Sequence, residues 1–471
     1  MATIPFWKRR KSFDAAQSHK SVLRPTLTWI HLIALGVGGI VGTGIYTLTG
    51  VGAGLAGPGV ILSFVIAGVV CACAALAYAE MATMIPMAGS AYTYTYVALG
   101  ELLAWFVGWS LILEYTVVCS AVAVGWSGYA AGVIKSAGWN VPDALLVGPH
   151  AGGIINVPAI LISLAVAGLL AIGSRESATV NLVLVILKLV ALAVFIALAL
   201  PAFNATHFEP FMPFGFQAHE VEGVKRGVMA AAAVVFFAFY GFDAVSTAAE
   251  EAKNPARDLT IGIVGSMVIC TLLYMGVSAA ALGGSDYQAL AASNEPLAYV
   301  LRILNHPHAA VFIGTVAVIA LPTVIMAFMY GQSRVFFAMA RDGMLPERLS
   351  AVHPRFGTPV TMTLVTGVIV AIIAGFLPLS QIAELANAGT LVAFIAVAIC
   401  MVVMRSRAPD KPRTFRAPLA PVLAIVAVVG CAYLFWSLPT LTIQRFVAWN
   451  VIGVVVYLLW ARRNSVLARV G

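Results

Sequence analysis

Three ionisable side chains interrupt long apolar stretches of this sequence, and they are the groups best suited to chemistry. They are Glu114 in "WSLILEYTVV", Lys188 in "LVLVILKLVALAV" and Asp243 in "FYGFDAVST". An ionisable group at the centre of a membrane helix costs roughly 2.5–3.5 kcal/mol on insertion scales, so it is a candidate for function. Each group therefore has two open interpretations, a structural contact or a proton carrier.

Lys188 carries the sharpest of these predictions. It lies near the middle of an apolar run, too deep for its ammonium to reach the membrane surface easily. Paired with Glu114 or Asp243, it would only hold helices together. Because burial disfavours a charged amine, it is also suited to couple a conformational change to a proton, or to replace a metal cation as a fixed charge. Structural and proton-path roles are both open for Glu114, and Asp243 is either a local helix cap or part of the coupling.

A glycine-rich stretch, "GVGGIVGTGIYTLTG", lies inside the first long apolar run, with six glycines in fifteen residues. A glycine in a helix interior costs about 1 kcal/mol against alanine, and a segment in lipid must satisfy its own backbone. We expect Gly36, Gly38 and Gly39 to permit close helix packing.

The composition predicts a membrane protein with many spans. Of the 471 residues, 61% are hydrophobic and only 10% are charged, and the mean hydropathy is +0.97, whereas a soluble domain carries roughly 25% charged residues. The first 24 residues are polar and basic without a cleavage signal, so we expect no removable signal peptide. Runs long enough to span, about 20 residues each, lie near 29–53, 58–85, 101–131, 154–172, 177–200, 227–248, 261–284, 309–333, 360–377, 382–404, 418–438 and 446–461.

Basic residues predict the orientation of these spans. Of the 27 Lys and Arg residues, 21 fall on the side of the two termini, 5 on the opposite side, and Lys188 within a span. Such a bias predicts cytoplasmic termini, and it explains the formal charge of +8 without nucleic acid. The six cysteines fall in predicted spans, and we interpret them as packing residues rather than metal ligands or disulfide partners.

Two glycine-interrupted segments lie five spans apart, in the first span and in the sixth, "FFAFYGFDAVST". An odd offset inverts the second unit relative to the first. Paired interrupted segments of this kind indicate a transporter built from inverted repeats, although chance matches between two short glycine segments are the other interpretation.

Four stretches make the resemblance to a known family specific. Besides the glycine-rich stretch, they are "ILSFVIAGVVCACAALAYAEMATMIPMAGSAYTYTYVALGE", "FFAFYGFDAVSTAAEEAKNPARDLTIGI" and "GQSRVFFAMARDGMLP". The chain resembles the amino acid–polyamine–organocation (APC) superfamily, close to the cationic amino acid transporter subfamily and its bacterial homologues.

The resemblance implies an all-α polytopic membrane protein with 12 transmembrane helices. Its five-plus-five inverted repeat (the LeuT-like, or APC, fold) would have broken helices 1 and 6 and two extra helices. The implied organisation is a tail at 1–25, a first repeat at 26–200, an outer loop at 201–226, a second repeat at 227–404, a basic inner loop at 405–417, two helices at 418–461 and a tail at 462–471.

The resemblance also implies a substrate site between the two broken helices. The α-carboxylate would meet the N–H groups of Gly42, Thr43 and Gly44. The α-ammonium would meet carbonyls at Ile40, Phe237, Ala238 and Tyr240, next to Gly241, with the Phe237 ring as a gate. Ile325, Phe328 and Met329 would form the side-chain pocket. Lys188 would replace a sodium ion and, with Glu114 and Asp243, couple transport to protons.

The function implied is secondary active import of L-amino acids across a bacterial inner membrane, by proton symport with alternating access. We expect neutral, alanine-like substrates; a cationic amino acid transporter or an exchanger are the alternatives. We expect no enzyme activity, no metal and no cofactor beyond the proton. The expected partners are a small-molecule L-amino acid and the lipid bilayer, not nucleic acid; the sequence leaves open a small single-span accessory subunit and the oligomeric state.

Overall fold

The computed structural model describes residues 9–13, 24–136, 138–139, 141–221, 224–293, 295–377 and 379–470. The predicted tail 1–25 is therefore described only at 9–13 and 24–25. The first group of helices is α2 (Trp29–Ile40), α3 (Thr43–Tyr46), α4 (Leu48–Ala56), α5 (Val60–Met84), α6 (Ala91–Ala98), α7 (Glu101–Ser136), α8 (Asp143–Leu146), α9 (Val157–Ile172) and α10 (Ser174–Ala199).

A short antiparallel hairpin separates the two groups of helices, with strands β1 (His219–Val221) and β2 (Val224–Arg226). The second group is α11 (Val228–Val235), α12 (Phe242–Thr247), α13 (Pro255–Gly284), α14 (Tyr287–Ala292), α15 (Pro296–Ile303), α16 (Pro307–Ala320), α17 (Pro322–Arg341), α18 (Val360–Phe376), α19 (Leu379–Arg407), α20 (Ala420–Trp436), α21 (Thr440–Val456), α22 (Arg462–Asn464) and α23 (Val466–Val470).

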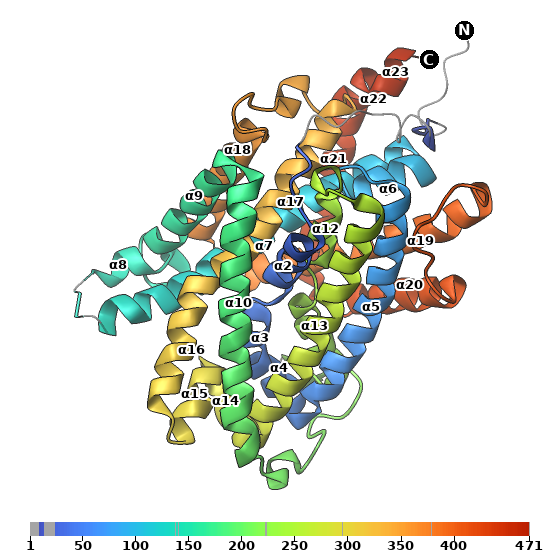
Figure 1. The fold of residues 1–471 in the computed structure, drawn as a ribbon. Helices are drawn as coiled ribbons and strands as arrows, with labels where there is room; N and C mark the ends of the chain where they lie inside the picture. Colours follow the sequence, from blue (N-terminus) through green and yellow to red (C-terminus); the bar gives the residue numbers. More distant parts are fainter. Residues whose placement is uncertain are drawn as a thin grey trace.

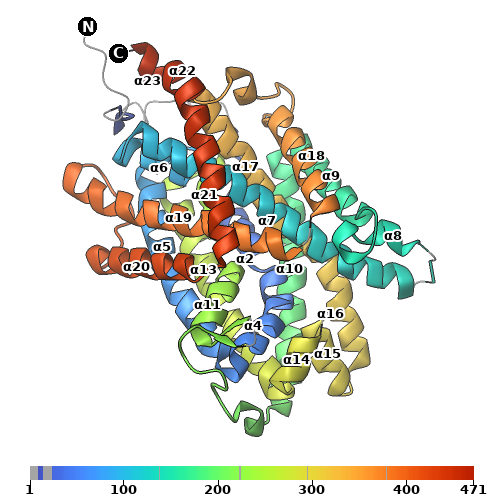
Figure 2. The ribbon, with the colours of Figure 1, turned by 180° about the vertical axis from the view of Figure 1, so that it is seen from behind.

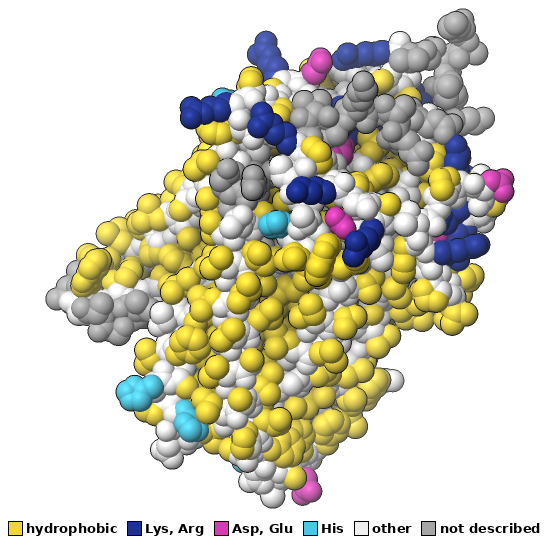
Figure 3. Space-filling view, in the orientation of Figure 1, with side chains coloured by type: hydrophobic (Ala, Val, Ile, Leu, Met, Phe, Trp, Pro, Cys, Tyr) yellow, Lys and Arg dark blue, Asp and Glu magenta, His cyan; other side chains and the backbone are white. Residues whose placement is uncertain are grey.

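The described residues 9–13 and helix α23, near the two ends of the chain, lie at one end of this helical bundle, here called the terminal face (Figures 1 and 2). The loop between α10 and α11, with its hairpin, lies at the opposite end, here called the far face. Figure 3 shows Lys and Arg side chains gathered at the terminal face and a broad apolar surface beyond them. An apolar surface of this extent is unusual for a soluble monomer and is suited to contact with lipid.

Helices long and apolar enough to cross a membrane are abundant, as the composition predicted. Within the described ranges there are eight: Leu48–Met84, Glu101–Ala131, Ala178–Ala202, Val228–Thr247, Pro255–Gly284, Pro307–Arg341, Leu385–Arg407 and Thr440–Asn464. Four shorter apolar helices are Trp29–Ile40, Val157–Ile172, Val360–Phe376 and Ala420–Trp436. The protein is thus mostly helical with many candidate spans.

Two of the predicted spans are interrupted. The first stops at Ile40 and resumes as α3 at Thr43, and the sixth consists of α11, a 3-10 turn at Phe236–Ala238 and α12 from Phe242. In the second interruption Gly241 has a φ of 128°, a conformation that residues with a Cβ rarely adopt. Glycine is therefore the residue that permits this change of chain direction.

Charged residues near the terminal face are more buried than the sequence suggested. From the sequence alone, Glu80 is predicted to lie near the cytoplasmic end of its span, in contact with water. Instead it is buried, and it pairs with Arg405 at 2.6 Å and with Arg413 at 3.4 Å. The eighth predicted span does not end at residue 333, because α17 continues to Arg341. At each of these two places a carboxylate pairs with an arginine, so neither charge of the pair needs to be in water.

A reciprocal tryptophan contact joins α21 to α7. The Trp109 indole N–H donates to the Trp449 carbonyl and the Trp449 N–H donates to the Trp109 carbonyl, each at 2.9 Å. The two rings stack with centroids 4.7 Å apart. These side chains are therefore packed between helices.

Replacing Trp449 with phenylalanine should keep much of the stacking but remove one of the two hydrogen bonds. The Trp109 carbonyl would then lack its donor, and we expect the unfolding temperature in detergent to fall by about 2–4 °C. The matched control is Trp436→Phe, since Trp436 is 82% exposed and should leave the unfolding temperature unchanged. Equal shifts for the two variants would contradict a structural role for this contact.

Candidate functional site

The interruption after α2 leaves backbone carbonyls that no longer have helical donors, and buried side chains supply them. The Lys188 ammonium, on α10, donates to the Gly38 carbonyl at 3.0 Å and to the Val41 carbonyl at 2.5 Å. The Tyr274 hydroxyl, on α13, donates to the Ile40 carbonyl at 2.6 Å. Three carbonyls around the break are thus held from two neighbouring helices, as the bilayer interior requires.

Lys188 also contacts the beginning of α17. Its ammonium donates to the Thr323 hydroxyl at 2.7 Å, and an ammonium has three N–H donors. All three are therefore used on oxygen atoms of neutral groups. The hypothesis that Lys188 pairs with Glu114 or Asp243 merely to hold helices together was wrong, because the break in α2 offers nearer oxygens.

The second interruption is fixed by Asp243, one of the three predicted coupling residues. Its Oδ1 accepts from the Gly241 N–H at 3.0 Å, and its Oδ2 accepts from the Tyr115 hydroxyl, on α7, at 2.5 Å. The carboxylate is buried. Asp243 therefore holds the backbone just before α12, whose N-cap residue is Gly241, and also ties the break to α7.

Glu114 precedes Tyr115 on α7 and is fully buried. Its Oε1 accepts from the Thr390 hydroxyl, on α19, at 2.6 Å, while its Oε2 has no hydrogen-bond partner. The Glu114 and Asp243 carboxylates lie close enough to interact electrostatically. Two predicted coupling residues are thus neighbours, and Lys188 is separate from both of them.

The two breaks cross with almost no space between their backbones. A Cβ on Gly39 would lie 3.2 Å from the Gly241 Cα, and a Cβ on Gly44 would lie 2.5 Å from the Ala238 Cα. Gly36 is equally tight against Ser266. Gly44, after the break, is therefore packed as closely as the glycines before it.

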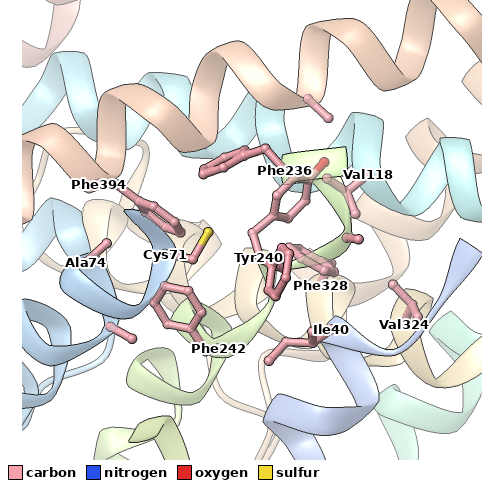
Figure 4. Close-up of a cluster of buried hydrophobic side chains, with 14 of the residues drawn as sticks. Ile40, Cys71, Ala74, Val118, Phe236, Tyr240, Phe242, Val324, Phe328 and Phe394 are labelled. Atoms are coloured by element: carbon pink, nitrogen blue, oxygen red, sulfur yellow. The ribbon is translucent and has the colours of Figure 1, made fainter. Parts of the chain in front are cut away.

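Aromatic rings form one wall beside the crossing (Figure 4). Tyr240 meets Phe328 edge-on with ring centroids 5.9 Å apart, and Phe237 meets Tyr240 at 4.9 Å. Phe328 also meets Tyr115 at 5.3 Å. The Tyr240 hydroxyl is buried without a hydrogen-bond partner. The structure thus brings together Phe237, Tyr240 and Phe328, three residues of the site that the resemblance implies.

The other residues of the predicted side-chain pocket are buried in α17. The Ile325 carbonyl accepts from the Cys119 thiol, on α7, at 3.6 Å. Met329 is fully buried, but within the described residues no hydrogen bond or ring contact joins it to the breaks. Val324 was not predicted, and its side chain is the atom group nearest to a Cβ built on Gly42, at 2.5 Å.

Access to the crossing is unequal from the two faces. From the far face, a cavity of about 450 Å³ extends inward to Phe237. On the terminal side, the space beside α2 that is lined by Leu27, His31 and Tyr330 measures only about 20 Å³. The larger of these two spaces thus reaches the crossing from the far face, at Phe237.

Buried ion pairs close the terminal side. Arg334 and Glu251, both buried, pair at 2.8 Å, and the Tyr330 hydroxyl donates to Glu251 at 2.7 Å. The Glu251 carbonyl accepts from the Leu27 N–H at 2.9 Å, just before α2 begins. A single residue thus links the entry to α2, the end of α12 and the middle of α17.

Sequence reasoning missed several of these partners. Tyr115, Tyr274 and Thr323 carry ordinary hydroxyl groups in apolar runs, and only the fold shows which oxygen or N–H they meet. The pairing of Glu251 with Arg334 did have a signal in the sequence. The acidic and basic residues of the stretches "AAEEAKNPARD" and "GQSRVFF" lie next to apolar runs.

Comparison with known proteins identifies the family to which these features belong. A sequence profile described as amino acid permease matches residues 27–457, which include both interrupted helices and Lys188. The chain belongs to the amino acid permease family. The resemblance to the APC superfamily is thereby confirmed, and the protein is a multi-pass membrane transporter rather than an enzyme.

The relatives of this permease are named for different substrates. It is 44% identical over 466 residues, 98% of each chain, to the branched-chain amino acid permease BcaP of Bacillus subtilis (strain 168). It is 41% identical over 464 residues, again 98% of each chain, to the methylthioribose transporter of the same organism. It is 38% identical over 412 residues, 85% of this chain and 66% of the relative, to the mitochondrial cationic amino acid transporter 3 of Arabidopsis thaliana.

Removing one member of the buried ion pair should destabilise the permease strongly. Glu251→Gln leaves the Arg334 guanidinium without its counter-charge, and we expect the free energy of unfolding to fall by about 3–5 kcal/mol. The matched control is Glu295→Gln, which breaks an exposed pair with Arg302 and should change it by less than about 1 kcal/mol.

The double variant Glu251→Gln/Arg334→Gln removes both charges and should recover part of the lost stability. Chemical denaturation in detergent measures all four proteins. A Glu251→Gln variant as stable as Glu295→Gln would contradict the structural importance of the pair.

Proposed function

We propose that this permease imports neutral, aliphatic L-amino acids by proton symport with alternating access. The observation that carries the proposal is the crossing of two interrupted helices beside the buried ammonium of Lys188. Interrupted helices expose backbone N–H and C=O groups inside a protein at membrane depth, where they suit a zwitterion. Every amino acid presents the same two charged groups to such a site.

The proposed site binds the substrate backbone through the protein backbone. Tyr274 occupies one lone pair of the Ile40 carbonyl, and a carbonyl oxygen has a second. The Tyr240 hydroxyl, buried without a partner, is placed to add a further hydrogen bond. The carboxylate would meet the N–H groups of Gly42, Thr43 and Gly44, and the ammonium would meet the carbonyls of Ile40, Phe237, Ala238 and Tyr240.

The proposed preference for neutral substrates rests on the apolar side-chain wall. Phe328 and Ile325 are buried and offer no charge to a substrate side chain. The relative that is 44% identical is named for branched-chain amino acids, which extends the alanine-like substrates expected from the sequence to larger aliphatic ones. One observation favours cationic substrates as the second candidate, namely the unpartnered Oε2 of Glu114.

Proton coupling is proposed through Lys188. A neutral amine has two N–H donors instead of three, so deprotonation would remove one of the bonds that join α10 to the Gly38 carbonyl, the Val41 carbonyl and Thr323. Release of the end of α2 would then accompany opening towards the termini. Glu114 and Asp243, linked through Tyr115, are proposed for the proton path.

The proposed arrangement in the membrane is that of twelve helices with a five-plus-five inverted repeat. The eight long and four shorter apolar helices supply the required segments. The gathering of Lys and Arg at the terminal face supports cytoplasmic termini, in a bacterial inner membrane. The cavity that reaches Phe237 would then face outwards, where an imported substrate enters.

Uptake into proteoliposomes tests the proposed function. We expect an alkaline interior, imposed without other gradients, to drive accumulation of labelled L-leucine more strongly than of L-arginine or methylthioribose. One-for-one exchange of leucine without net accumulation would replace symport by exchange. Uptake of arginine alone would support the cationic alternative, and uptake of methylthioribose alone would overturn the amino acid assignment.

Two substitutions of Lys188 distinguish the role of its positive charge from the role of its titratable proton. Lys188→Met removes both, and Lys188→Arg keeps a positive charge that does not titrate in the physiological range; both variants should reduce gradient-driven leucine uptake to the level of protein-free liposomes. The control is Lys253→Met, because the Lys253 side chain is exposed. Normal pH-dependent uptake by Lys188→Met would reduce Lys188 to a structural residue.

A further inference from the structure

The far-face cavity has the size and lining of a small-molecule site. Its volume is about 450 Å³, within the range of pockets that hold small ligands. Aliphatic side chains, among them Leu48, Leu55 and Val234, form most of the wall. The cavity lies between α4 and α11, which pack side by side near the hairpin (Figure 2).

Two polar side chains stand out on this apolar wall. Asn387, on α19, is 5% exposed; its amide N–H donates to the Ala233 carbonyl at 3.3 Å, while its Oδ1 has no hydrogen-bond partner. A buried amide oxygen without a donor is unfavourable, because it has lost its hydrogen bonds to water. A donor on a bound molecule would remove this penalty.

Lys225 supplies the second polar group, a positive charge at the cavity edge. It lies in β2 opposite Glu220, yet no ion pair joins these two residues in the described part of the chain. Its ammonium instead donates to the Ser437 carbonyl, on the cavity wall, at 3.4 Å. An ammonium with one such long bond has further donors for an anion.

We propose that this cavity is a second, outer binding site for a zwitterionic amino acid with an aliphatic side chain. The inference rests on the proposed function, because it deepens the route by which that substrate reaches the crossing. Lys225 binds the carboxylate, Asn387 accepts a hydrogen bond from the ammonium, and the aliphatic wall contacts the side chain. A substrate held here waits until the Phe237 ring, which lines the inner end of the cavity, moves aside.

This assignment explains why an apolar cavity wall carries both a positive charge, on Lys225, and a hydrogen-bond acceptor, on Asn387. A cationic ligand would be repelled by Lys225, and an uncharged apolar ligand would leave Asn387 unsatisfied. A zwitterion with an aliphatic side chain satisfies both groups. The outer site would therefore favour neutral over cationic amino acids before they reach the crossing.

The test measures the initial rate of labelled L-leucine uptake into proteoliposomes as a function of concentration. We expect Lys225→Gln to raise KM about fivefold at low salt with kcat unchanged, and the effect should shrink at high ionic strength. Asn387→Leu should raise KM, whereas Asn387→Asp, which keeps the acceptor, should not. The matched control for charge loss is Arg302→Gln, since Arg302 lies away from the cavity in an exposed pair with Glu295.

Two leucine analogues sharpen the assignment of each end. The carboxylate 4-methylpentanoate should inhibit wild-type uptake but not uptake by Lys225→Gln. The amine isoamylamine, which Lys225 repels, should inhibit uptake by Lys225→Gln more strongly than uptake by the wild-type protein, and this gain should be lost in Lys225→Gln/Asn387→Leu. If wild-type protein takes up leucine and both variants keep the wild-type KM, the outer site is wrong while the proposed function stands. If wild-type protein takes up no amino acid, both proposals fail.

Discussion

A break in a membrane helix and a buried charge are each unfavourable alone, and in this permease they compensate one another. The break after α2 removes helical donors from carbonyls that no water reaches, and a lysine ammonium at membrane depth lacks the hydration that would stabilise it. Lys188 compensates for both, because its ammonium donates hydrogen bonds to the carbonyls of Gly38 and Val41. The position of α2 against α10 and α17 follows from these bonds and from Thr323.

The contacts around this bridge differ between the two faces of the bundle. Gly39 and Gly241 let the two interrupted helices touch backbone to backbone, so a shift of one must move the other. On the terminal side, Glu251 and Arg334 form a buried seal, whereas the far side keeps a cavity that reaches Phe237. Alternating access requires such an asymmetry, because a seal on one side must persist while the other side is open.

Patterns along the chain predicted the class of fold and the places where its helices break. Apolar runs and the glycines near residue 42 and at residue 241 are local signals, and each is expressed in the helices that contain it. Partners across the bundle were harder to predict, because contact depends on helix rotation and depth. Pairing with a carboxylate was one interpretation left open for Lys188, but its ammonium meets carbonyls instead. A sequence shows charged side chains but not which backbone groups a break sets free. Glu80 was expected to be wetted for the same reason, because its partners Arg405 and Arg413 lie more than 300 residues away. The substrate contacts at Gly42, Thr43 and Gly44 stay predictions.

The central claim is that leucine and a proton enter together through the bridge that Lys188 controls. Its most direct test records the internal pH of proteoliposomes, loaded with a pH-sensitive dye and without any imposed gradient, when external L-leucine is added. The account predicts acidification of the interior that requires leucine and is absent from Lys188→Met proteoliposomes. Entry of labelled leucine into wild-type proteoliposomes at a constant internal pH would contradict it.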